Sequence, residues 1–226
     1  MTEAWLKRGQ IFDPASRASH PKLLTHAANP LPIRIEGDTY RCFYSARDAQ
    51  QRSSVGAVDI DFETRKVVRE FNKPFFTHGN EGTFYSDGVS IGNCYVADGT
   101  QYMLFMGWHN PTDSHWRGEI GRLIVTPELE LELESTTPLI GLNEQDPISL
   151  SYPWVHKNSE TDFHMWFGST KSWDAGNGEM LHTIEHATSV DGHNWIRNQD
   201  PIPSEIGVAQ AFSRPTVLKT PGENYR

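Results

Sequence analysis

Short apolar and aromatic stretches return along the chain at nearly constant spacing. The clearest one runs from Gln101 to Trp108 and follows the turn signal Asp98-Gly99. Similar stretches begin at Tyr40, Phe163 and Tyr225. The leading aromatic residues stand at positions 40, 102, 163 and 225, which gives steps of 62, 61 and 62 residues. A repeat of this length predicts one structural unit that is used several times.

Each repeat contains signals for four short strands. A proline or glycine at residues 30, 88, 153 and 215 marks the start of the first strand, and a hairpin signal separates it from the aromatic stretch. A third stretch follows at residues 54–61, 119–126 and 183–189. A piece that begins with Pro74, Pro138 or Pro201 is predicted to be the fourth strand. Because proline cannot donate to a sheet ladder, we expect this piece at the outer edge.

Four short antiparallel strands per repeat are typical of a β-propeller blade. A β-sandwich also has many short strands, but it would not place four landmarks at one shared step. We therefore expect one all-β domain over residues 1–226, built of four-stranded antiparallel blades. An N-terminal arm (1–24) precedes blades at 25–76, 77–140 and 141–203, and residues 204–226 begin a fourth blade. A ring of five such blades needs roughly 310 residues, so we expect a truncated propeller, either a fragment or a chain with an unusual closure.

Composition and charge narrow the range of partners. The chain has 226 residues and a formal net charge of −9, which argues against nucleic acid and anionic membranes as partners. No apolar run reaches the roughly 18 residues of a membrane span, and no secretory signal is visible. The two cysteines, Cys42 and Cys94, are expected to be buried free thiols, and a cytoplasmic location is the default.

The predicted loops between second and third strands carry aromatic and polar residues. They comprise residues 47–52, 108–116 and 171–178. Such residues on loops over a rigid scaffold indicate a ligand site, with Trp108 and Trp173 as candidates to contact the ligand. The alternative is that these tryptophans pack between blades.

The blade pattern resembles the five-bladed propeller glycosidases, which include arabinanase, β-xylosidase, invertase and levansucrase-like enzymes. The residues that carry the resemblance are the strand Met165-Trp166-Phe167-Gly168-Ser169 and the turn Ser189-Val190-Asp191-Gly192-His193-Asn194-Trp195. The pattern is most similar to family-43-like relatives, including uncharacterised proteins associated with bacterial surface-polysaccharide synthesis. The turn itself is expected to be structural, with Asp191 and Gly192 forming it and Trp195 packing.

The resemblance implies a site at the channel mouth with three acids on the first strands of blades one to three. Asp87 matches the second of these positions. The first position is Asn29, and the third is Ser151 with Tyr152 beside it. Asparagine and serine cannot transfer protons as a carboxyl group does at neutral pH, so two of the three acids are missing.

Other residues could complete such a site. His26, just before the first inner strand, has a side chain suited to acid–base work; a solvated or structural histidine is the alternative. Arg47 and Asp48 could clamp a charged group on a sugar or form a surface ion pair. Arg214 is expected in the register of Asp87 and Asn29, as a partner of Asp87. Glu81 and Glu185 also lie near inner-facing positions, but we expect structural roles for both.

We expect no metal site and no cofactor, because no ligand spacing, phosphate loop or dinucleotide motif occurs. The sequence favours a carbohydrate-active, glycoside hydrolase-like propeller with Asp87 and His26 as catalytic candidates and a carbohydrate as its partner. A glycan-binding propeller that has lost its catalytic acids is the alternative, and a scaffold propeller is the third. The sugar, the activity and the oligomeric state stay open.

Overall fold

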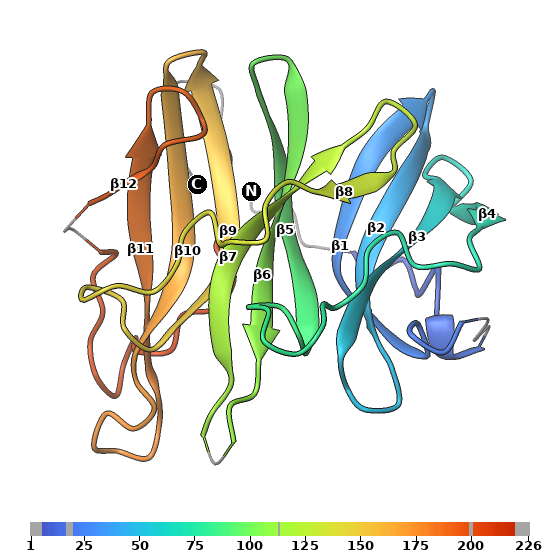
Figure 1. Ribbon diagram of the computed structural model, residues 1–226. Coiled ribbons are helices and arrows are strands. Elements are labelled where there is room, and N and C mark those ends of the chain that lie inside the picture. The colour runs from blue at the N-terminus through green and yellow to red at the C-terminus, as the bar shows by residue number, and fades with distance from the viewer. Residues whose placement is uncertain (1–5, 17–19, 113, 199–200, 220–226) are drawn as a thin grey trace.

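The recurring aromatic stretches form the second strand of each of three antiparallel blades (Figure 1). The computed structural model describes residues 6–16, 20–112, 114–198 and 201–219. The first blade consists of β1 (Thr25–Glu36), β2 (Thr39–Arg47), β3 (Ser53–Asp61) and β4 (Lys66–Glu70). The second consists of β5 (Gly88–Ala97), β6 (Thr100–His109), β7 (Arg117–Val125) and β8 (Leu131–Leu133). The third consists of β9 (Ser149–Ser159), β10 (Asp162–Ser172), β11 (Leu181–Ser189) and β12 (Ile196–Arg197).

The all-β propeller prediction is confirmed, and a 3-10 turn at Pro14–Ser16 is the one helical element of the described residues. Where the fourth blade is predicted, the described residues 204–219 form isolated bridges, Glu205 with Ala209 and Ala211 with His182, and no strand; the aromatic stretch at Tyr225 lies outside the described residues. The numbered limits of the predicted blades stay a prediction.

The second strands are continuous apolar runs because both of their faces are buried. Alternate residues of a strand point to opposite faces. Met103 and Phe105 of β6 therefore pack in the cluster shared with the first blade, and Tyr102 and Leu104 pack in the cluster shared with the third. The middle blade is thus covered on both sides.

Adjacent blades approach closely at their inner strands. The side-chain amide of Asn93 in β5 donates to the carbonyl of Val155 in β9 at 2.7 Å, and the amide oxygen of Asn93 accepts from the N–H of Val155 at 2.8 Å. These two hydrogen bonds link the sheet of the second blade to the sheet of the third. Gly92 and Gly118 allow the approach, because a Cβ at either position would overlap a backbone carbonyl oxygen of β9.

The prediction that the proline-led pieces are the fourth strands is wrong. The fourth strands are β4, β8 and β12, which come earlier in the chain. The pieces after Pro74 and Pro138 return to the third strand and make isolated bridges, Val55 with Phe76 and Ile120 with Ile140. Proline removes a ladder donor, so these pieces pair at single points only. The true outer strands are short, and β4 is mostly exposed and rich in charge, which hid it from the apolar pattern.

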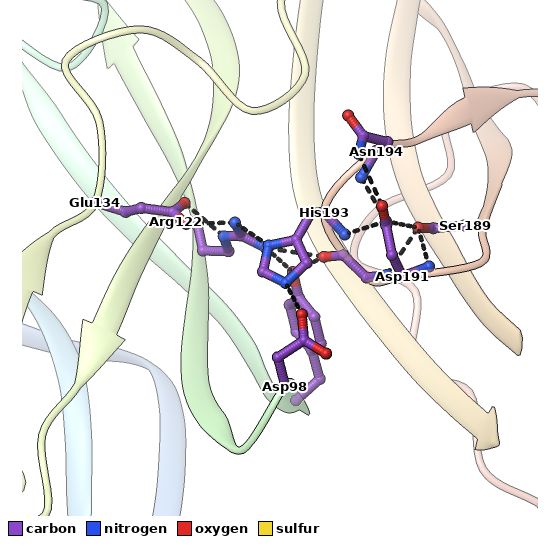
Figure 2. Close-up of polar contacts among 9 residues, drawn as sticks. Asp98, Arg122, Glu134, Ser189, Asp191, His193 and Asn194 are labelled. Atoms are coloured by element: carbon purple, nitrogen blue, oxygen red, sulfur yellow. Dashed lines mark hydrogen bonds and ion pairs between the residues drawn. The ribbon is translucent and has the colours of Figure 1, made fainter. Parts of the chain in front are cut away.

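The turn at residues 189–195 is closed by its own side chains (Figure 2). The hydroxyl of Ser189 accepts from the N–H of Gly192 at 2.8 Å, and Oδ1 of Asp191 accepts from the N–H groups of His193 and Asn194, each at 2.8 Å. These N–H donors hold the pKa of Asp191 well below its usual value. Gly192 has φ of +73°, which favours glycine. The turn therefore has the structural role expected from the sequence.

Arg122 of β7 joins this turn to the second blade (Figure 2). Its guanidinium donates to the carbonyl of Gly192 at 2.8 Å and to the hydroxyl of Tyr95 at 2.6 Å, and it forms a two-point ion pair with Glu134. It also lies 3.9 Å from the centre of the Tyr102 ring. We call this group of four side chains and one carbonyl the Arg122 clamp.

Both cysteines are free, Cys42 buried and Cys94 half-buried. Burial raises the pKa of Cys42 to about 11 and the pKa of Cys94 to about 12. The two thiols are therefore protonated at neutral pH. Among the residues that the structure describes, no helix is long and apolar enough to cross a membrane.

Candidate functional site

The connections between second and third strands gather at one end of the three blades, the lower end in Figure 1. Antiparallel strands alternate in direction, so this end also carries the starts of the inner strands. We call this end the loop face. It comprises residues 48–52, 78–87, 109–112, 114–116 and 173–180.

Asp87 stands in a pocket of about 570 Å³ on the loop face. Its backbone is fixed between two blades, since its N–H donates to the carbonyl of Trp108 and its carbonyl accepts from the N–H of Ser53, both at 3.0 Å. Oδ2 of Asp87 accepts from the N–H of Asn110 at 2.8 Å. The other residues of the pocket that matter here are Arg52, His78, Glu81, His109 and Asn110. The chain thus presents one oriented, half-buried carboxylate beside polar and basic groups.

Asp48 supports this pocket from behind. Its buried carboxylate accepts from the N–H groups of Gln50 and Arg52 at 2.9 and 2.8 Å, which closes the loop between β2 and β3. Nε of Arg52 donates to Oδ2 of Asp48 at 2.9 Å. Asp48 was a candidate for binding substrate, and the structure shows it positioning Arg52 at the pocket wall.

Two histidines of the pocket were not anticipated from the sequence. The side chain of His78 is 8% exposed, and its Nδ1 lies 3.3 Å from the carbonyl of Gly79. Burial lowers the pKa of His78. Within the described residues, Nε2 of His78 and Nδ1 of His109 have no hydrogen-bond partner. A buried polar atom without a partner costs about 1–3 kcal/mol. Nε2 of His78 lies 3.7 Å from Oδ2 of Asp48, beyond hydrogen-bond distance.

An aromatic wall lies on the other side of the loop between β6 and β7. Trp173 stacks on His115 with ring centres 4.5 Å apart and meets Trp116 edge-on at 5.2 Å. These three rings line a second hollow of about 310 Å³. The loop that carries Trp173 is fixed by Asp174, whose Oδ1 accepts from the N–H groups of Gly176 and Gly178 at 2.7 and 3.0 Å. Trp173 is therefore held at a ligand-accessible surface.

Trp108, by contrast, packs between the first two blades. Its Nε1 donates to the hydroxyl of Ser53 in β3 at 3.1 Å, and its indole covers Gly88 at the start of β5. This is the packing role that the sequence left as its alternative. The side chain of Trp108 does not line the Asp87 pocket.

Arg214 does not pair with Asp87, contrary to the prediction. Its guanidinium donates to Oδ1 of Asn29 at 3.0 Å and to the carbonyl of Gly92 at 3.2 Å. Burial lowers the pKa of Arg214, an effect that nearby Tyr152 opposes. Asn29 and Tyr152 have positive φ values, +54° and +44°, at irregular points of β1 and β9. Arg214 therefore contacts β1 and β5 at Asn29 and Gly92 rather than Asp87.

The predicted register of Arg214 is also wrong. Gln210 takes the place of Asp87 in the fourth repeat, because its carbonyl accepts from the N–H of His182 as that of Asp87 accepts from Ser53. The residues that follow, Ala211 and Gly88, form the equivalent parallel bridges. The proline after Arg214 suggested the wrong alignment, four residues too late.

Ser151 is fully buried, which leaves its side chain no surface for a ligand. Its hydroxyl lies 2.8 Å from Nε2 of His182, and Nδ1 of His182 lies 2.8 Å from the hydroxyl of Thr170. The local reason is Gly168, where any side chain would overlap both Ser151 and His182. This cluster belongs to the interior of the third blade.

The remaining candidates lie outside the Asp87 pocket. His26 is exposed, has φ of +66° and lies 2.8 Å from the hydroxyl of Thr25. Arg47 is exposed and contacts Gln51 at 3.5 Å. Neither residue lines the pocket. Glu185 is buried and pairs with Lys171 at 3.0 Å, whereas Glu81 is exposed and lines the pocket with Asp87.

The carboxylates and imidazoles of the described residues form no group of three or more that could hold a metal ion. The groups on the loop face offer hydrogen bonding, charge and aromatic contact. Asp87 and Glu81 supply acceptors, Arg52 supplies donors, and Trp116 and Trp173 supply apolar ring faces.

No family model matches the sequence. The uncharacterized proteins MT1551 and Rv1502 of Mycobacterium tuberculosis are each 37% identical to the chain over 222 residues. The aligned region covers 97% of this chain and 73% of each relative.

Solved structures share the fold at low sequence identity. The BT0996 RGII complex matches with a TM-score of 0.61 at 14% identity, over 84% of this protein and 61% of that one. A thermostable family-43 glycoside hydrolase matches with a TM-score of 0.58 at 15% identity, over 82% and 58%. The endo-arabinase from Bacteroides thetaiotaomicron VPI-5482 matches with a TM-score of 0.57 at 16% identity, over 87% and 67%. The match spans about three fifths of the first of these structures.

Proposed function

This protein belongs to the same family as the uncharacterized Mycobacterium tuberculosis proteins MT1551 and Rv1502, and we propose that it binds a glycan at its loop face. The observation that carries this proposal is the oriented carboxylate of Asp87 in a polar pocket that adjoins an aromatic wall. Sugars present hydroxyl groups around their rims and apolar C–H faces above and below the ring. A site for them therefore needs fixed acceptors and donors together with flat aromatic surfaces.

The two halves of the loop face meet these needs separately. Asp87 accepts one N–H through Oδ2, and no hydrogen bond to its Oδ1 occurs within the described residues, so that oxygen can accept from a sugar hydroxyl. Arg52 is held at the pocket wall by Asp48 and adds N–H donors. Trp173 and Trp116 are half-buried, and each keeps part of its ring exposed for stacking. The similarity in fold to a family-43 glycoside hydrolase and an endo-arabinase supports a carbohydrate ligand.

Glycoside hydrolysis is the second candidate function. It requires two carboxyl groups, one on each side of the scissile glycosidic bond. Asp87 and Glu81 line the same pocket, and this observation favours the second candidate. Asn29 and Ser151 supply no carboxyl group at the other positions that the resemblance implies, so we place binding first.

Replacing Asp87 with asparagine tests both functions. The change keeps the shape of the side chain and removes its charge. Since a hydrogen bond to a charged group contributes about 1.5–3 kcal/mol, we expect binding to weaken by roughly 10- to 150-fold. The measurement is calorimetric titration with oligosaccharides, accompanied by a turnover screen with aryl glycosides.

The matched control is Asp98→Asn, the same change on the exposed hairpin between β5 and β6 at the other end of the blade. This control should bind as the unaltered protein does. Turnover that disappears with Asp87→Asn would assign hydrolysis. Equal binding by both variants would contradict the role of Asp87, and an unaltered protein that binds no glycan would contradict the proposed function.

A further inference from the structure

The hollows of the loop face adjoin one another. The Asp87 pocket shares Gly82, Ser86 and His109 with a neighbouring hollow of about 360 Å³. It shares Pro111 with the hollow of about 310 Å³ at the aromatic wall. The three hollows therefore lie side by side around the base of the loop between β6 and β7, and we call them together the depression.

The size of this depression exceeds the need of a single sugar. Each hollow alone is within the range of about 300–1,000 Å³ that encloses a drug-sized ligand. The aromatic wall also lies beyond the Asp87 pocket rather than inside it, since Trp116 and Trp173 do not line that pocket. A monosaccharide bound by Asp87 would therefore leave Trp173 without contact.

The charges that line the depression are mainly negative. Asp87 and Glu81 line the Asp87 pocket, and Glu119 lines the hollow of about 360 Å³. Oε2 of Glu119 accepts from the N–H of Leu142 at 3.1 Å. The positive charge of Arg52 is balanced by Asp48 at 2.9 Å, and Arg117 places a second positive charge at the aromatic wall. A carboxylate on a sugar unit beside Asp87 would meet these acids in partly desolvated surroundings, where repulsion is stronger than in bulk water.

We propose that the loop face takes an extended oligosaccharide that contacts Asp87 with one uncharged sugar unit and Trp173 with another unit. This inference rests on the proposed function and deepens it by naming the class of ligand. The sugar unit at Asp87 is held by hydrogen bonds, and the unit at Trp173 is held by stacking. Affinity should therefore grow with the number of units until both contacts are made.

Calorimetric titration with arabino- and xylo-oligosaccharides of one to six units tests the length. We expect affinity to rise at least tenfold between one unit and the longer members of the series that binds. The Trp173→Ala variant should remove this rise and leave the binding of the shortest ligand unchanged. The Trp173→Phe variant keeps an aromatic face and should restore part of the rise, which separates stacking from loss of folding.

Oligogalacturonates of the same lengths test the charge. At low salt they should bind at least tenfold more weakly than uncharged oligosaccharides, and the difference should shrink as salt is added. Equal affinity for one unit and six units would overturn the extended site, and tighter binding of the galacturonates would overturn the preference for an uncharged unit at Asp87. If none of these sugars binds, the proposed function itself fails, so the failures can be told apart.

Discussion

At the scale of single residues, His182 shows how the interior of the third blade fixes a protonation state. Both of its ring nitrogens lie 2.8 Å from hydroxyl groups, those of Ser151 and Thr170. Burial, with a smaller effect of the positive charge of Lys171, lowers the pKa of His182 to about 4. His182 is therefore neutral in the folded protein, whereas it takes up a proton in the unfolded chain near pH 6.5.

This difference predicts a dependence of stability on pH. Between about pH 6.5 and pH 4 the unfolded state binds more protons than the folded state, so the free energy of unfolding falls as the pH falls. We expect the protonation of His182 in the unfolded chain to lower the free energy of unfolding by about 2 kcal/mol at pH 5 relative to pH 7.5. Urea unfolding at both pH values measures the change.

The His182→Asn variant isolates this contribution. It should be less stable at both pH values, but the loss between pH 7.5 and pH 5 should be smaller than in the unaltered protein. Part of the dependence will persist, because burial also lowers the pKa values of His78 and His186. A variant with the full pH dependence would show that His182 is not the responsible group.

At the scale of elements, the Arg122 clamp joins the second and third blades through one turn. Arg122 is buried, and it is the shared partner of Glu134, the hydroxyl of Tyr95 and the carbonyl of Gly192. Removing Arg122 leaves the half-buried carboxylate of Glu134 without its counter-charge and the buried hydroxyl of Tyr95 without its donor, which costs more than the ion pair contributes.

We therefore expect Arg122→Met to lower the free energy of unfolding by about 3 kcal/mol. The matched control is Lys73→Met, which breaks the exposed pair with Glu130 at 3.3 Å and should cost less than about 1 kcal/mol. Urea unfolding of both variants at neutral pH gives the comparison. If the two variants lose similar amounts of unfolding free energy, the Arg122 clamp contributes no more to stability than an exposed ion pair does.

At the scale of the whole molecule, the sequence predicted the fold better than the site. The steps of 61 and 62 residues predicted the positions of β2, β6 and β10, because a strand that is buried on both faces has a continuous run of apolar and aromatic residues. The outer strands were misplaced, because their short, polar segments carry no apolar pattern. Asp87 was found because it directly precedes the first strand of its blade.

The rest of the site could not be read from the sequence, because it depends on contacts between distant segments. His78 meets Asp48 across 30 positions of the sequence (78 − 48), and the ring of Trp116 meets that of Trp173 across a whole repeat. The glycine-rich turn around Glu81 suggested a structural role, but the fold places it beside Asp87. Spacing alone does not show which loops share one end of neighbouring blades.

The most direct test of the central claim, a glycan site on the loop face, is the mapping of amide chemical shifts by two-dimensional NMR during titration with the oligosaccharide that binds best. The account predicts that shifts cluster at residues 48–52, 78–87, 109–112 and 173–180, and that Asp87→Asn reduces them. Shifts that cluster at the Arg122 clamp, at the opposite end of the blades, would contradict it, as would no shifts at all.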